Sequence, residues 1–157
     1  QEAFQYRDLE FLKLLIEAAE IANRHNEDLW IMDYFYYLDS VGGEKTMKEY
    51  AVYKRCQSAI QKNDRIVIYG AGDIGTHVYK VLQNQNICEI DAWVDKYKAE
   101  TVIFDRMIKG LDYLCRNKGN YDYILIAIDH PSIPDAVREE LILLDIGSDK
   151  IKLWNEL

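Results

Sequence analysis

Three glycines spaced as in a nucleotide-binding loop are the feature of this sequence best suited to chemistry. Gly70, Gly72 and Gly75 follow a β-branched run and precede a helical pattern. In such a loop the first glycine makes a tight turn, the second lets the backbone approach a pyrophosphate, and the third lets the helix pack on the strand. Exposed N–H groups and the positive helix end then favour phosphate. The pattern predicts a diphosphate site at Gly70, Ala71, Gly72, Asp73, Ile74 and Gly75.

An acidic residue stands where the ribose of a dinucleotide would lie. Asp95 ends the next expected strand, twenty positions after Gly75, where a carboxylate can accept hydrogen bonds from an adenosine ribose. The alternative is a glycine-rich turn that binds no ligand. S-adenosylmethionine is disfavoured because Ile68 stands where such sites usually have an acid. Lys96 and Lys98 follow Asp95, and they either meet a 2′-phosphate or are simply solvated.

Strand and helix patterns alternate from residue 63 onward. Strands are expected over 65–69, 90–94, 101–104, 123–128 and 151–154, and helices after the glycine loop, over 111–118 and over 132–144. Ser132 and Asp135 have the spacing of a capping box at the start of the last helix. This order predicts parallel crossovers and a sheet covered on both faces. The expected fold class is therefore α/β, with a parallel sheet of about five strands.

Residues 1–62 are predicted to form a helical N-terminal segment, distinct from a nucleotide-binding domain over 63–157. Helices are expected over about 6–24, 28–41 and 44–61. Three such helices cannot bury so wide an apolar surface among themselves, so we expect them to pack on the next domain or on a second subunit. The aromatic run over 30–37 forms either an interface or an ordinary helix core.

Segments 65–75, 93–96 and 121–127 resemble those of a known family. They are similar to the Rossmann-like nucleotide-binding domains found beside bacterial surface-polysaccharide enzymes. These include domains of nucleotide-sugar dehydratases and sugar O-acetyltransferases, and accessory domains of glycosyltransferases and methyltransferases. The resemblance covers about residues 63–157. It implies a Rossmann-like fold that binds NAD, NADP or a nucleotide-sugar at the glycine loop, with the ribose on Asp95.

Asp129 and His130 follow the strongest expected strand, at the carboxyl edge where open α/β sheets bind ligands. His130 either acts as an acid, a base or a hydrogen-bonding group for a sugar hydroxyl, or is a solvated turn residue beside a helix cap. A Tyr50–Lys54 pair has the spacing used by short-chain dehydrogenases, but it precedes the glycine loop and is interpreted as coincidence. Whether the chain is an enzyme stays open. If it is one, we expect an NAD(P)-dependent nucleotide-sugar oxidoreductase or dehydratase.

Charge and composition narrow the classes of partner. The 157 residues carry 19 Lys and Arg against 27 Asp and Glu, a net charge of −8. Both residues 1–62 and residues 63–157 carry more acidic than basic side chains, whereas binding to nucleic acid or to an anionic membrane surface requires an excess of Lys and Arg. No apolar run is long enough for a membrane span. Three dispersed cysteines and three histidines predict reduced thiols, no metal site and a cytoplasmic protein. The chain begins with Gln1 rather than Met, so we also expect an excised piece of a longer protein.

The function expected from these patterns is binding of a dinucleotide or nucleotide-sugar. We expect an accessory or regulatory module of bacterial surface-carbohydrate metabolism, as a homo-oligomer or joined to a partner domain through the N-terminal helices. One alternative is a subunit or fragment of an NAD(P)-dependent nucleotide-sugar-modifying enzyme. Another is a nucleotide-sensing interaction domain.

Overall fold

The computed structural model describes residues 44–157, with side chains from residue 51 onward. The first two predicted helices lie outside the described residues. The chain divides into two compact units, Gln1–Lys54 and Arg55–Leu157, and all strands described below belong to the second. The domain boundary expected at residue 62 stays a prediction. Over residues 44–157 no helix is both long and apolar enough to cross a membrane.

The described elements follow one another in an alternating order. They are α3 (Glu44–Ala59), β1 (Arg65–Tyr69), α4 (Asp73–Asn84), β2 (Glu89–Val94), β3 (Val102–Ile103), β4 (Arg106–Met107), α5 (Leu111–Arg116), β5 (Tyr123–Ile126), α6 (Ile133–Leu143), the short 3₁₀ helix η1 (Ser148–Lys150), β6 (Ile151–Leu153) and a second 3₁₀ helix, η2 (Trp154–Glu156).

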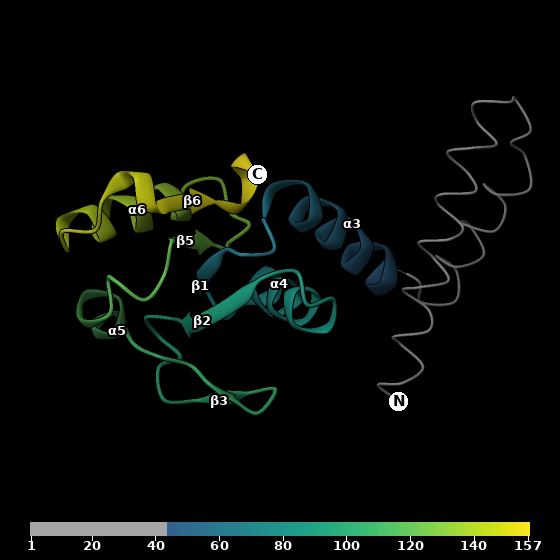
Figure 1. Cartoon of the computed structure of the whole chain (residues 1–157), viewed down its shortest axis with the longest axis horizontal. Coiled ribbons are helices and arrows are strands. Elements are labelled where there is room, and N and C mark those ends of the chain that lie inside the picture. Colours follow the sequence, from purple (N-terminus) through teal and green to yellow (C-terminus); the bar gives the residue numbers. More distant parts are fainter. Residues whose placement is uncertain (1–43) are drawn as a thin grey trace, which may run out of the picture. The chain divides into compact units, whose positions relative to one another are not determined.

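Four strands form the main sheet, in the order β2-β1-β5-β6, and every neighbouring pair is parallel (Figure 1). The expectation of about five strands is corrected at residues 101–104. There β3 pairs antiparallel with β4 in a separate two-stranded hairpin. Phe104 and Asp105 both have positive φ, 50° and 61°, as in the two-residue turns that reverse a hairpin tightly. The chain therefore turns back before a further parallel strand can form.

Apolar side chains cover both faces of the sheet. One face packs against α5 and α6 in a cluster that includes Val67, Tyr69, Ile124, Ile126, Leu114, Val137 and Leu141. On the opposite face Tyr79 of α4 stacks on Trp93 of β2, with ring centroids 4.4 Å apart. Helices on the two faces shield the sheet from water, which is why strands such as β1 and β5 consist mainly of apolar residues.

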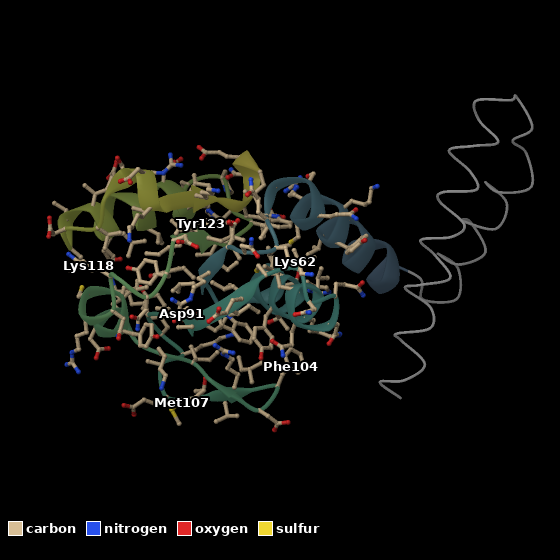
Figure 2. All side chains as sticks on the ribbon, in the orientation of Figure 1. Lys62, Asp91, Phe104, Met107, Lys118 and Tyr123 are labelled. Atoms are coloured by element: carbon tan, nitrogen blue, oxygen red, sulfur yellow. The ribbon has the colours of Figure 1, made fainter. Side chains whose placement is uncertain are left out.

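The hairpin is anchored to α4 and β2. The Phe104 ring stacks on Tyr79 with centroids 6.3 Å apart, and Figure 2 shows Phe104 near α4 and Met107 further along the hairpin. The Arg106 guanidinium donates to the carbonyls of Ile90 and Asp91, at 2.8 and 2.9 Å. The pairing register of β2 against β1 shifts at this point. The irregularity disrupts the regular backbone hydrogen bonds there, and the Arg106 side chain donates to these two carbonyls instead.

Candidate functional site

Three loops meet at the carboxyl edge of the sheet. The glycine loop follows β1, the loop that begins at Asp95 follows β2, and the loop with Asp129 and His130 follows β5. From β1 the chain goes to β2 on one side, and it then returns to β5 on the other side. The strand order therefore reverses between β1 and β5, which is the point at which open α/β sheets bind their ligands.

Gly70 and Gly75 are both required by close packing. Gly70 has φ +107°, and a Cβ there would lie 3.0 Å from the carbonyl oxygen of Ala127. A Cβ on Gly75 would fall far inside contact distance of the Gly70 carbonyl oxygen. The first glycine thus permits the turn and the third lets α4 begin directly against it, as the spacing predicts.

Gly72 differs from the other two glycines of the loop. It stands at the N-cap position of α4, and a Cβ built on it would have no heavy atom within 4 Å. Open space therefore lies beside the start of α4, where the first N–H groups of a helix have no carbonyl partner within the helix. A diphosphate placed there would be close to the positive end of a 12-residue helix.

The indole of Trp93 holds the glycine loop from the neighbouring strand. Its Nε1–H donates to the Gly70 carbonyl at 2.7 Å, and the Gly70 N–H donates to the Val94 carbonyl at 2.8 Å. Both groups of Gly70 are therefore paired, and the turn is bonded to β2 by backbone and by side chain. Sequence reasoning missed this contact, because nothing in the spacing links a strand tryptophan to the loop.

Asp95 bonds to three backbone N–H groups. Its Oδ2 accepts from Ala71 at 2.8 Å, and its Oδ1 accepts from Tyr97 at 2.8 Å and Lys98 at 3.0 Å. An ionised carboxylate offers about four acceptor positions, so one remains for a ligand hydroxyl. The carboxylate predicted to hold a ribose therefore braces the glycine loop in this structure. Its role toward a ribose stays a prediction.

Two lysines after Asp95 contact different parts of the chain. The Lys98 Nζ donates to the Ala71 carbonyl at 2.6 Å. The Lys96 Nζ pairs with Glu140 Oε1 of α6, also at 2.6 Å, and this hydrogen bond raises the pKa of Lys96. The phenol of Tyr69 is also affected by nearby carboxylates. Burial, together with the negative charges of Glu140 and Asp95, raises the pKa of this phenol to about 12.

His130 caps α6, which corrects the capping box expected from Ser132 and Asp135. The Ser132 side chain makes no capping hydrogen bond. Instead the His130 Nδ1 accepts from the N–H groups of Ser132 at 3.2 Å and Ile133 at 3.3 Å. Because Nδ1 is the acceptor, the hydrogen-bond network assigns the proton of the neutral ring to Nε2. Asp129 and His130 are both exposed at the β5 edge.

The remaining predicted loop residues take different environments. Ala71 is buried and Ile74 half-buried. Asp73 is exposed in the first turn of α4, with its Oδ1 3.5 Å from the Nδ1 of His77. Among residues 51–157 no group of three or more His, Cys, Asp or Glu side chains could hold a metal ion.

A pocket of about 280 Å³ lies away from the glycine loop. Residues of the β4–α5 region line it, among them Met107, Lys109, Tyr113 and Arg116. None of the candidate residues named from the sequence belongs to its lining. The glycine loop and this pocket are therefore separate features of the domain.

The sheet order and the glycine loop define the chain as an α/β protein with a Rossmann-like domain. No protein-family model and no curated protein matches it. Among solved structures, UDP-D-quinovosamine 4-dehydrogenase from Vibrio fischeri matches with 21% identity and a TM-score of 0.45, over 58% of this chain and 75% of that chain.

A Rex-family repressor, RSP, matches with 15% identity and a TM-score of 0.43, over 95% of this chain and 82% of its own. The same repressor has been solved with β-NADH and with β-NAD⁺ and operator DNA. All of these similarities are distant.

Proposed function

We propose that the Rossmann-like domain binds a dinucleotide, NAD or NADP, or a nucleotide-sugar at the glycine loop. The observation that carries this proposal is the contrast among the three glycines. Gly70 and Gly75 are closed in by backbone, whereas Gly72 opens on free space at the start of α4. A turn that served packing alone would need the first and third glycines but would not need an open second position.

Each part of the ligand has a place in this proposal. The diphosphate lies beside Gly72 on the first-turn N–H groups of α4. The ribose uses the remaining acceptor position of Asp95, and the base lies in an apolar slot beside Ile74 and Ile128. Asp129 and His130 border the ligand from the β5 side, and His130 presents its Nε2–H as a donor.

The role in the cell follows from the sequence resemblance. We propose an accessory or regulatory module in bacterial surface-carbohydrate metabolism that recognises its ligand without transforming it. The described part of the site supports binding better than catalysis, because both ends of the Asp95 carboxylate and the Nδ1 of His130 already bond to backbone N–H groups. These groups hold the loops in place and are poorly placed to exchange protons with a substrate.

Calorimetric titration with NAD⁺, NADH, NADPH, UDP-sugars and coenzyme A tests the proposal. Gly72→Val is the informative variant, because its side chain enters open space and should not disturb the fold. Gly119→Val is the matched control, since a Cβ on Gly119 also meets no atom within 4 Å and Gly119 lies outside the three loops of the site.

We expect one ligand class to bind the wild-type protein and the Gly119→Val variant equally, and to lose affinity in Gly72→Val by at least about tenfold. Thermal unfolding of both variants checks that the fold is kept. Absence of binding across the whole panel would show that the glycine loop is a structural turn. Equal binding by the two variants would place the ligand elsewhere.

A further inference from the structure

We propose that Lys98 is a diphosphate-binding residue of this site, supplying the positive charge that the glycine loop itself lacks. This inference rests on the proposed function and adds a residue to it. The general glycine-loop mode of binding relies on backbone N–H groups and the helix end. Here the structure adds a side-chain ammonium to that loop.

The Lys98 ammonium is held at the glycine loop by a direct hydrogen bond. Its Nζ lies 2.6 Å from the carbonyl oxygen of Ala71, one residue before the open Gly72. The Lys98 backbone is also held near the loop, because the Lys98 N–H donates to Asp95 Oδ1 at 3.0 Å. An ammonium group has three donors, and the contact with Ala71 uses one of them.

The charge on Lys98 is not neutralised by a carboxylate. Among residues 51–157 no Asp or Glu oxygen lies within salt-bridge distance of this ammonium. Lys96, two residues earlier, is paired with Glu140 at 2.6 Å. The two lysines therefore differ: Lys96 forms an ion pair with Glu140 of α6, whereas Lys98 forms no direct ion pair and donates to the Ala71 carbonyl.

An anionic ligand needs such a charge here because the surrounding loops are acidic. Asp73 is in the first turn of α4, Asp95 bonds to the loop, and Asp129 follows β5. These carboxylates oppose the approach of a diphosphate. The 0.5 elementary charge or so that a helix terminus contributes does not offset several of them, whereas a lysine ammonium adds a full charge.

The same geometry limits which backbone groups the phosphate can use. Asp95 Oδ2 accepts the Ala71 N–H and Lys98 Nζ donates to the Ala71 carbonyl, so both backbone groups of Ala71 are already occupied. The diphosphate is left with the N–H groups from Gly72 onward and with the free donors of Lys98. The ligand that fits has at least two phosphoryl groups, one for the helix start and one for the ammonium.

A competing role for Lys98 is to brace Ala71 without touching the ligand, and the two roles predict different measurements. A brace affects every ligand that uses the loop, with or without phosphate, and leaves the salt dependence of binding unchanged. A phosphate ligand affects diphosphates more than monophosphates, and its loss reduces the salt dependence, because binding then neutralises one charge fewer.

The experiment compares Lys98→Met, Lys98→Arg and the control Lys96→Met, each as the full chain. Calorimetry measures ADP, UDP, AMP, UMP and NADH at low and high salt, and thermal unfolding of each variant is recorded in parallel. The methionine retains the length of the stem and removes the charge. The arginine retains the charge and serves as the conservative rescue.

We expect Lys98→Met to weaken binding of the diphosphates by about ten- to a hundredfold, to weaken the monophosphates less, and to flatten the salt dependence. Lys98→Arg should recover most of the affinity, and Lys96→Met should bind within about twofold of wild type. Equal losses for mono- and diphosphates with an unchanged salt dependence would overturn the inference in favour of the brace. So would wild-type affinity in Lys98→Met. Failure of the wild-type protein to bind any of these nucleotides, together with NAD⁺, NADPH, UDP-sugars and coenzyme A, would instead overturn the proposed function itself.

Discussion

The indole N–H of Trp93 donates to the carbonyl oxygen of Gly70 at 2.7 Å, and both residues are buried. This bond joins the strand before Asp95 to the first glycine of the loop. The same ring stacks on Tyr79 of α4, so Trp93 contacts the loop and the helix that the loop begins. The residue is therefore placed to hold the glycine loop in a single conformation.

Trp93→Phe should destabilise the protein by about 1–3 kcal/mol, because it removes the donor and leaves a buried carbonyl unpaired. Urea unfolding measures the change in the free energy of unfolding. Trp154→Phe is a suitable control, since the Trp154 ring is buried and makes a cation–π contact with Arg55 at 4.8 Å. A larger loss in Trp154→Phe than in Trp93→Phe would contradict the importance assigned to the indole hydrogen bond.

Gly75→Ala should be strongly destabilising, by more than about 3 kcal/mol. An alanine inside a helix normally stabilises it by about 0.5–1 kcal/mol relative to glycine, so the expected sign is reversed by the contact with the Gly70 carbonyl. Circular dichroism during thermal unfolding measures the effect. Gly119→Ala, in open space, should change stability by no more than about 1 kcal/mol. A stable Gly75→Ala variant would show that α4 can move away from β1.

His130→Ala should lower stability by about 1 kcal/mol, as expected for the loss of a helix cap. Ser132→Ala should change it by less than about 0.5 kcal/mol, because the Ser132 side chain makes no capping hydrogen bond. His130→Asn, which retains a short polar acceptor, should recover part of the loss. Chemical unfolding of the three variants gives the order of stability. The opposite order, with Ser132→Ala less stable than His130→Ala, would support the capping box predicted from the sequence.

Alkaline pH should destabilise the domain from about pH 9 upward. Burial raises the pKa of Cys56 from 9.0 to about 12 and that of Cys88 from 9.0 to about 11. Burial is also the main cause that raises the pKa of Tyr69 from 10.0 to about 12. In each case the folded-state pKa exceeds the unfolded one, so the unfolded chain releases its proton first and the free energy of unfolding falls as pH rises.

Each of these groups contributes a slope of at most about 1.4 kcal/mol per pH unit between its unfolded and folded pKa. Urea unfolding between about pH 8 and pH 11 measures the combined slope. Tyr69→Phe should flatten the profile above pH 10, the ordinary pKa of a tyrosine. A variant profile that runs parallel to that of the wild type would contradict the burial assigned to this phenol.

Local patterns predicted much of the sheet. The runs at 65–69, 90–94, 123–128 and 151–154 match β1, β2, β5 and β6 to within two residues at each end, because β-branched runs between turn residues suit strands buried on both faces. The roles of Gly70 and Gly75 were also predicted, since only glycine fits a positive φ or a contact of helix with turn. The prediction that residues 101–104 form a strand of the main sheet was wrong, because the pairing of this segment depends on the turn at Phe104 and Asp105.

The amino-acid sequence by itself determined that strands and helices alternate, that a glycine loop joins the first described strand to a helix, and that an acid ends the next strand. These are properties of neighbouring residues and depend on periodicity and backbone conformation. Only the tertiary structure decided that Asp95 and Lys98 both bond to Ala71, that Trp93 holds Gly70, and that His130 caps α6. The bonds of Asp95, Lys98 and Trp93 join residues more than twenty positions apart. The His130 cap was not predicted because Ser132, at the usual N-cap position, has the residue type and spacing of a capping box. The three long-range bonds follow from how the packed sheet brings its loops together, whereas the cap follows from the conformation of the loop between β5 and α6.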